Sequence, residues 1–325
     1  MDREPVIGAV IIGRNEGDRL GLCLVSVGKQ VSHIVYVDSG SDDGSVERAR
    51  MAGADVVELD MTRPFTAARA RNAGLEALTA GRDVDFVQFI DGDCELQEGW
   101  VATASAFLIQ HSDAAVAFGR RRERFPEKSI YNRLCDWEWD TPIGMVNSCG
   151  GDALMRVQAL KDVDGFDPSL IAGEEPELCV RLRAWRWQIW RLDHEMTLHD
   201  ADMTRFAQFW KRTHRAGHAF AEGAALHGLP PERHWVRETR KAIYWGLLIP
   251  LLIVLLAWLF SPKALLLFLI YPAQIVRLAL RDGRDSAAWE RAVLLVVGKF
   301  AEMTGVMEYW LRRLLGRPRG LVEYK

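Results

Sequence analysis

Residues 86–95 read Phe-Val-Gln-Phe-Ile-Asp-Gly-Asp-Cys-Glu, a short apolar run that ends in two carboxylates separated by one glycine. An apolar run of this length, bounded by Asp and Gly, is typical of a buried strand in a parallel sheet. Open α/β sheets bind their ligands just beyond the carboxyl ends of such strands. Asp91 and Asp93 are therefore candidate ligands for a hard cation such as Mg²⁺ or Mn²⁺. The alternative is an ordinary turn, because Asp and Gly are common turn residues.

The residues before this stretch alternate between apolar runs and helical patterns. The runs at 6–12, 34–37 and 55–59 are each followed by a segment with helical spacing, the last of them at 66–78. Strand and helix repeated at this spacing predict a doubly wound α/β sheet of the Rossmann-like kind.

Charge is distributed unevenly along the chain. The 325 residues carry a net charge of −3, but residues 236–325 have an excess of Lys and Arg and the remainder an excess of Asp and Glu. The basic residues of the C-terminal part interrupt hydrophobic segments, which favours a membrane surface over a nucleic acid as partner. The five cysteines show no CxxC spacing and are odd in number, which favours thiols in a reducing compartment. The N-terminal residues lack the pattern of a signal peptide, so none is expected.

Polar residues follow the other predicted strands as well. Asp38 could accept hydrogen bonds from a nucleotide base, Arg71 could pair with a phosphate, and the backbone around Arg14 could form a pocket floor. Each residue also has a purely structural explanation: Asp38 could begin a turn, and Arg71 could lie on a solvated helix face.

Glu174 and Glu175 begin a predicted helix. They either stabilise the helix dipole or supply a general base to the crevice that contains Asp93. His199 is either a neutral imidazole ligand for the cation or a half-buried polar residue. Trp137 and Trp139 either line a sugar pocket or pack in the core. The Arg-rich run at 120–124 is typical of a solvated strand edge, and could also hold an anionic acceptor.

The ordered set of motifs resembles the family-2 inverting glycosyltransferases of the GT-A fold, over about residues 5–220. The resemblance rests on Val-Ile-Ile-Gly-Arg-Asn-Glu-Gly, Val-Asp-Ser-Gly-Ser-Asp-Asp-Gly-Ser, Ala-Arg-Asn-Ala-Gly and Asp-Gly-Asp, the last a form of the family's DxD motif. Gly-Gly-Asp-Ala-Leu-Met, Gly-Phe-Asp and Gly-Glu-Glu-Pro-Glu-Leu-Cys follow later in the chain.

The resemblance implies a role for each candidate. Residues of the nucleotide site would be Arg14, Glu16, Asp38, Arg71 and Asp91. Asp93 would bind a Mn²⁺ or Mg²⁺ ion on the sugar diphosphate, with Asp91 and His199 as further ligands. The catalytic base would be Glu175, with Glu174 as the alternative, because this chain has Glu-Glu where the family usually has Glu-Asp. Trp137, Trp139, Gly150 and Gly151 would lie on the acceptor side.

These roles imply transfer from a nucleotide-sugar donor to a lipid-linked or glycan acceptor in polysaccharide or glycolipid synthesis, by one displacement that inverts the anomeric carbon. The Gln-x-x-Arg-Trp motif of processive members is absent in that order, so addition of a single sugar is expected. Three alternatives remain: a polyprenyl-phosphate sugar synthase, a non-catalytic sugar-nucleotide-binding scaffold at the membrane, and a nucleotidyltransferase on a related fold.

The C-terminal third contains an uncharged stretch at 242–260 that is long enough to cross a bilayer, and a second apolar stretch at 264–276. Basic residues flank this pair on both outer sides, which predicts a catalytic domain on the cytoplasmic face of the inner membrane. A buried core hairpin and a re-entrant hairpin are the alternatives. The expected domains are a GT-A domain at 1–235, a membrane-embedded hairpin at 236–285, and an amphipathic basic membrane-surface helix with its tail at 286–325.

Overall fold

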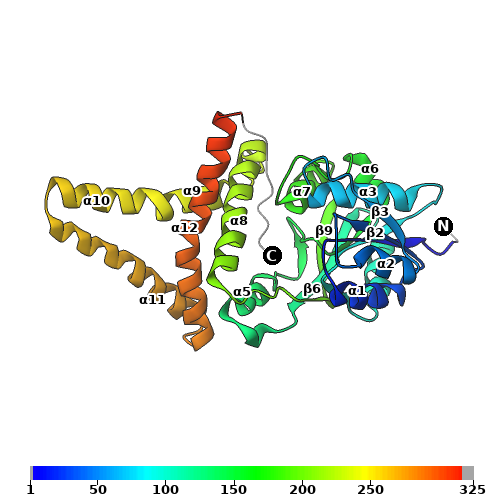
Figure 1. The fold of residues 1–325 in the computed structure, drawn as a ribbon. Helices are drawn as coiled ribbons and strands as arrows, with labels where there is room; N and C mark the ends of the chain where they lie inside the picture. Colours follow the sequence, from blue (N-terminus) through cyan, green and yellow to red (C-terminus); the bar gives the residue numbers. More distant parts are fainter. Residues whose placement is uncertain (1–2, 317–325) are drawn as a thin grey trace. The chain divides into compact units, whose positions relative to one another are not determined.

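The computed structural model describes residues 3–316, which divide into two compact units (Figure 1). The α/β unit comprises residues 3–125 and 135–202, and the helical unit comprises residues 126–134 and 203–316. The expected first domain, 1–235, thus includes a helix, α8 (Phe206–His227), that the structure groups with the helical unit. Residues 317–325 of the expected basic tail lie outside the described residues.

Among the described residues, nine strands form one mixed sheet in the order β3-β2-β1-β4-β8-β6-β9-β5, with β7 paired to β9. The first four in this order are parallel, as the sequence predicts: β3 (Asp55–Glu58), β2 (His33–Asp38), β1 (Ile7–Gly13) and β4 (Phe86–Asp91). The central residues of β1, β2 and β4 are buried, which explains their apolar sequences, whereas those of the edge strand β3 are only partly buried.

The carboxyl ends of these strands are aligned by register. Gly13 pairs with Asp38 across β1 and β2, and Ile12 pairs with Asp91 across β1 and β4. Asp38 and Asp91 therefore lie at the same edge of the sheet, where the sequence places the ligand.

Helix α3 (Ala67–Thr79) fixes the position of Arg71 over this edge. The helix packs directly on β1 and β2, because Gly74 has no side chain: a Cβ at Gly74 would lie 2.3 Å from Cγ1 of Val10. Thr66 caps the helix by accepting a hydrogen bond from the Arg69 N–H at 3.1 Å. The remaining helices of the parallel half are α1 (Asp18–Gly28) and α2 (Ser45–Met51).

The second half of the sheet departs from the doubly wound pattern. Here β8 (Ala153–Arg156) pairs antiparallel to both β4 and β6 (Ala114–Glu123). The long strand β9 (Gln188–His199) runs parallel to β6 and antiparallel to β5 (Cys94–Leu96) and β7 (Gly144–Val146). Helices α4 (Trp100–Gln110), α6 (Val157–Asp162) and α7 (Glu174–Ala184) pack on these strands.

The pairing of β9 brings residues from three strands together. Cys94 of β5 and Glu123 of β6 are both register partners of His199. The β6–β9 ladder shifts register twice around Arg120, so the faces occupied by Arg120 and Arg121 do not follow simple alternation.

The helical unit is built around a close crossing of α8 and α12 (Ser286–Leu314). Glycines permit this approach: a Cβ at Gly305 would lie 2.0 Å from the carbonyl oxygen of His214, and one at Gly217 would lie 2.0 Å from that of Glu302. Much of the apolar face of α12 is therefore covered by protein, and the expected membrane-surface role of this helix stays a prediction.

Among the described residues, two helices are long and apolar enough to cross a membrane. The first, Val236–Leu259, is continuous through α9 (Val236–Ile243), a π-helical turn (Tyr244–Leu248) and α10 (Ile249–Leu259). The second, Pro262–Asp282, combines a 3-10 segment (Pro262–Leu269) with α11 (Ile270–Asp282). Only 11% of the most apolar window of each helix is buried within the protein, so they are not a buried core hairpin.

Candidate active site

The loops after β1 and β2 are bound to each other. The Asn15 N–H donates to Ser41 Oγ at 2.9 Å, and the Asp42 N–H donates to Asn15 Oδ1 at 2.9 Å. Asp38 shapes the second loop, because its Oδ2 accepts from the N–H groups of Gly40 and Ser41 at 2.9 and 2.8 Å. These hydrogen bonds thus hold the two expected nucleotide-binding loops against each other.

The two candidate nucleotide-binding residues in the loop after β1, Arg14 and Glu16, differ in exposure. Arg14 is exposed, whereas Glu16 is largely enclosed and forms an ion pair with Arg19 at 2.8 Å. The Asp38 carboxylate is 3% exposed and also accepts a hydrogen bond from the Tyr36 hydroxyl at 3.0 Å.

Arg71 is the central cation of the site. Its guanidinium is buried and pairs with Asp91 at 3.0 Å, Glu174 at 2.8 Å and Glu175 at 2.9 Å. It therefore links the end of β4 to the first turn of α7. The solvated-face alternative for Arg71 is wrong, because its side chain is only 3% exposed.

Asp152, a buried residue just before β8, holds Asp91 from the other side. Asp152 Oδ1 accepts a hydrogen bond from the Asp91 N–H at 3.1 Å, and its Oδ2 accepts one from Thr197 Oγ1 at 2.8 Å. Because both carboxylate oxygens of Asp152 accept hydrogen bonds inside the protein, they hold the backbone at the end of β4 in place.

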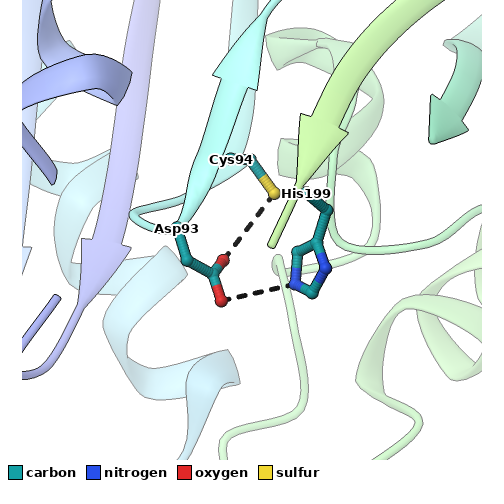
Figure 2. A group of neighbouring side chains, drawn as sticks. All are labelled: Asp93, Cys94 and His199. Carbon is teal, nitrogen blue, oxygen red and sulfur yellow. Dashed lines mark hydrogen bonds and ion pairs between the residues drawn. The ribbon is translucent and has the colours of Figure 1, made fainter. Parts of the chain in front are cut away.

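Asp93 and His199 meet beside Cys94 (Figure 2). His199 Nε2 lies 3.3 Å from Asp93 Oδ2, and Cys94 Sγ lies 3.7 Å from Asp93 Oδ1. The other imidazole nitrogen, Nδ1, lies 3.8 Å from Glu123 Oε2, and the ring packs edge-on against Trp139 with centroids 4.8 Å apart. His199 is buried rather than half-buried, with both nitrogens directed at carboxylates.

The donor atoms of this cluster suit a divalent cation. Among residues 3–316, two groups of side chains have ligand atoms within 4.8 Å of one another: Asp93 with Cys94 and His199, and Asp91 with Cys94 and Asp152. Carboxylate oxygen and imidazole nitrogen are ligands for Mn²⁺, and carboxylate oxygen is preferred by Mg²⁺. Burial and Arg121 lower the pKa of His199, but Asp93 and Glu123 raise it more, so the net shift is upward.

Glu175 is the best placed proton acceptor. Burial, followed by the charges of Glu174 and Asp91, raises the pKa of Glu175 from its ordinary 4.5 to about 7, against the lowering effect of Arg71. Its side chain remains 13% exposed, whereas that of Glu174 is 6% exposed. A carboxylate with a pKa near neutrality is suited to general-base catalysis.

Gly151 leaves room between these groups. A Cβ at this position would lie 2.6 Å from Arg71 Nη2 and 3.2 Å from both Asp91 Oδ2 and Glu175 Oε1. A Cβ at Gly150 would have nothing within 4 Å. Gly151 therefore belongs to the site, and Gly150 lies beside it with open space.

Residues 9–162 match the family model described as glycosyl transferase family 2. This part of the chain belongs to that family. The succinoglycan biosynthesis protein ExoA of Rhizobium meliloti is 27% identical over 190 residues, which are 55% of this chain and 57% of ExoA. The pre-mycofactocin glycosyltransferase of Mycobacterium tuberculosis is 30% identical over 158 residues, which are 43% of this chain and 32% of that protein. The chain thus spans only part of the length of these curated relatives.

A solved structure supports the fold over nearly the whole chain. The mannosyltransferase PcManGT from Pyrobaculum calidifontis, in complex with GDP-Man and Mn²⁺, aligns with a TM-score of 0.60. The alignment covers 95% of this chain and 88% of that protein at 17% identity. The chain therefore has the GT-A fold.

Within this family-2 domain, the structure brings most of the predicted site together. Arg71, Asp91, Glu174 and Glu175 form one connected group, and Asp93 and His199 form the adjoining one. The two tryptophans separate: Trp139 packs on His199, whereas Trp137 is 42% exposed. The solvated-edge interpretation of the run at 120–124 holds for Arg122 and is wrong for Arg120 and Arg121.

Sequence reasoning gave no individual role to four residues of the site. They are Cys94, Arg121, Glu123 and Asp152. Cys94 and Asp152 could have been found from the motifs, because each directly follows a candidate residue, Asp93 or Gly151. Arg121 and Glu123 were singled out only as part of the run at 120–124, because their positions in the site depend on the register shifts between β6 and β9.

Proposed function

We propose that this protein is a metal-dependent inverting glycosyltransferase that transfers a single sugar from a nucleotide-sugar donor to a hydroxyl of a lipid-linked or glycan acceptor. One observation carries the proposal: Asp93 and His199, whose donor atoms suit a cation, adjoin, through Asp91 and Arg71, a carboxylate whose pKa is near 7. The first group suits a diphosphate with its metal, and the second suits deprotonation of an acceptor.

The reaction is one displacement. Glu175 takes the proton of the acceptor hydroxyl as its oxygen bonds to the anomeric carbon, and the bond from that carbon to the donor phosphate breaks with its electron pair on the leaving diphosphate. Attack opposite the leaving group inverts the anomeric carbon. A divalent cation held by Asp93 and His199, with Asp91 beside them, supplies positive charge for the diphosphate when bound.

Arg71 positions both the donor side of the site and the catalytic base. Its contacts with Asp91 and Glu175 keep the donor side and the base in fixed relation, because one guanidinium spans both carboxylates. Asp38, at the edge of the sheet, is placed to define the nucleotide pocket together with the loop of Arg14 and Glu16.

The relatives support the classes of donor, cofactor and pathway. PcManGT was solved with GDP-Man and Mn²⁺, which favours a nucleotide-sugar donor and Mn²⁺ over Mg²⁺ as the first metal to test. ExoA is a succinoglycan biosynthesis protein, which favours surface polysaccharide assembly.

Membrane attachment belongs to the same proposal. The helices Val236–Leu259 and Pro262–Asp282 each contain a long apolar window, of which only 11% is buried within the protein. Arg240, Lys241 and Arg281 lie toward their outer ends, and only Lys263 lies in the connection. This distribution favours an inner-membrane protein with its catalytic domain in the cytoplasm.

The test is release of nucleoside diphosphate by the full chain in detergent with Mn²⁺. A panel of nucleotide sugars is supplied with and without lipid-linked and glycan acceptors. We expect acceptor-stimulated release from one donor class, reduced about 10²- to 10⁴-fold in Glu175→Gln because the general base is removed. Glu195→Gln is the matched control, since Glu195 is an exposed partner of Arg122.

Two results would contradict the proposal. No release from any donor by the folded protein would remove the transferase function. Release that Glu175→Gln retains at near wild-type rate would instead indicate an acceptor that needs no base, such as a polyprenyl phosphate.

A further inference from the structure

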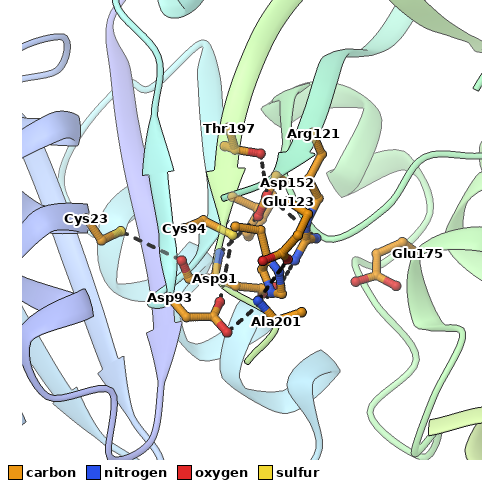
Figure 3. A network of polar contacts seen from close by, with 12 residues as sticks. Cys23, Asp91, Asp93, Cys94, Arg121, Glu123, Asp152, Glu175, Thr197 and Ala201 are labelled. Atoms are coloured by element: carbon orange, nitrogen blue, oxygen red, sulfur yellow. Dashed lines mark hydrogen bonds and ion pairs between the residues drawn. The ribbon is translucent and has the colours of Figure 1, made fainter. Parts of the chain in front are cut away.

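Arg121 lies inside the site, whereas the sequence pointed to it only as one member of the Arg-rich run at 120–124. It extends from β6 into the cluster that contains Asp91 and Asp152 (Figure 3), and its side chain is 16% exposed. The next residue, Arg122, faces away, is 48% exposed and pairs with Glu195.

The hydrogen-bonding capacity of Arg121 is poorly used. Its Nη2 is 3.5 Å from Asp91 Oδ2, and its Nη1 is 3.6 Å from Asp152 Oδ2. Charge-assisted hydrogen bonds are shorter, about 2.7–2.9 Å. The buried Nε of Arg121 has no hydrogen-bond partner among residues 3–316. The Nε of Arg71 likewise has no partner among these residues, but the rest of its guanidinium meets three carboxylates at 2.8–3.0 Å.

An aromatic ring supports the guanidinium of Arg121. Its Cζ lies over the ring of Trp139, 4.8 Å from the centroid, and the same tryptophan packs against His199. A flat aromatic face stabilises a cation without fixing its hydrogen bonds. Arg121 is thus held beside His199, with its N–H donors directed at carboxylate oxygens of Asp91 and Asp152 that lie 3.5–3.6 Å away.

We propose that Arg121 binds the diphosphate of the nucleotide-sugar donor and stabilises the charge that develops on it when the sugar leaves. This inference rests on the proposed transferase function. Its planar fork can meet two phosphate oxygens at once, in place of the long contacts to Asp91 and Asp152.

The diphosphate is favoured over an anionic acceptor by the partners of Arg121. Arg121 shares Asp91 with Arg71 and shares Trp139 with His199, so it belongs to the metal side of the site. A cation bound by Asp91 would compete with Arg121 for that carboxylate, and the incoming phosphate would offer Arg121 replacement oxygens. Arg121 takes part in no bond change and acts only by hydrogen bonding and charge.

The experiment compares nucleoside diphosphates with monophosphates by calorimetric binding to the full chain in detergent with saturating Mn²⁺. The probes are UDP, GDP, ADP and CDP and the corresponding monophosphates. For the nucleotide that binds, we expect Arg121→Gln to weaken diphosphate binding about 10- to 100-fold. Monophosphate binding should change less than twofold, because the base pocket around Asp38 is intact.

Two further variants sharpen the comparison. Arg121→Lys keeps the charge but loses the fork, so its diphosphate affinity should lie between those of wild type and Arg121→Gln. Arg122→Gln is the matched control and should bind like wild type. Retained monophosphate binding also shows that each variant is folded.

The outcomes separate the two proposals. Equal losses of diphosphate and monophosphate affinity would make Arg121 a structural residue and overturn the inference, as would a diphosphate affinity within twofold of wild type. Failure of the wild-type protein to bind any diphosphate would instead remove the donor site itself, and the proposed function with it.

Discussion

At the scale of single residues, the acidity of Glu175 sets the pH range in which the proposed reaction runs. Its pKa of about 7 means that the carboxylate is protonated at lower pH and cannot accept the acceptor's proton. We expect kcat/KM to fall about tenfold per pH unit below 7 and to level off above it. Rates measured from pH 5.5 to 8.5 test this, with metal and donor saturating at each pH. A rate independent of pH across 7 would exclude Glu175 as the base.

The same shift predicts an effect on stability. A pKa raised from 4.5 to about 7 means that the folded state binds the Glu175 proton more tightly than the unfolded state, so ionisation destabilises the fold as pH rises between these values. Glu175→Gln cannot ionise. Its melting temperature relative to wild type should therefore be higher at pH 8 than at pH 5.5. A relative melting temperature that falls as pH rises would show that the Arg71 ion pair outweighs burial.

Gly151 gives a prediction with a neighbouring control. Arg71 is clamped by three carboxylates, so it cannot easily move the 2.6 Å contact that a Cβ at residue 151 would make. Gly151→Ala should destabilise the protein by about 1–3 kcal/mol, as overpacking does elsewhere. Gly150→Ala should leave the melting temperature unchanged, because the added methyl meets nothing within 4 Å. Thermal unfolding of both variants measures these changes. Equal shifts in melting temperature for Gly151→Ala and Gly150→Ala would contradict the packing described for Gly151.

At the scale of elements, the parallel half of the sheet could be predicted because three of its strands, β1, β2 and β4, are buried and have apolar sequences. The positions of Asp38 and Asp91 followed, since parallel strands end at a common edge. The second half could not be predicted in the same way. Arg121 and His199 come together only through the pairing of β6 with β9 and its register shifts, which leave no mark in the local sequence. His199 was a candidate ligand from its own chemistry and from the family resemblance, and Arg121 was considered only within the run at 120–124.

The crossing of α8 and α12 provides a test of packing within the helical unit. Two glycines of α12 differ in surroundings: a Cβ at Gly305 would lie 2.0 Å from a backbone oxygen, whereas one at Gly298 would find its nearest neighbour at 3.4 Å. Gly305→Ala should destabilise the protein by about 2–3 kcal/mol. Gly298→Ala should be neutral or stabilise it by up to about 1 kcal/mol, because Ala favours helix. Denaturant unfolding in detergent measures both. The same sign of effect at the two positions would contradict this account.

At the scale of the whole molecule, the sequence predicted a catalytic domain at 1–235 and an apolar part after it. The structure instead groups residues 203–316 with the helical unit. Hydropathy identifies the helices Val236–Leu259 and Pro262–Asp282 because each contains a long apolar window with few charged residues. It does not identify α8 as part of the helical unit, because this helix carries Lys211, Arg212 and Arg215 and resembles a soluble helix. Its association with α12 depends on small residues at one crossing, which hydropathy does not weigh.

The proposed membrane attachment depends on the apolar surface of these two helices, which includes Leu252 of α10 at 55% exposure. A lysine near the centre of a membrane helix costs about 2.5–3.5 kcal/mol. Leu252→Lys should therefore shift the full chain from liposomes made with anionic lipid into the soluble fraction. Leu229→Lys is the matched control, since Leu229 is 82% exposed but lies outside both helices. Flotation of the two variants beside wild type measures the shift. Equal flotation of all three would mean that another surface binds the membrane, and wild-type protein that remains soluble would remove the attachment altogether.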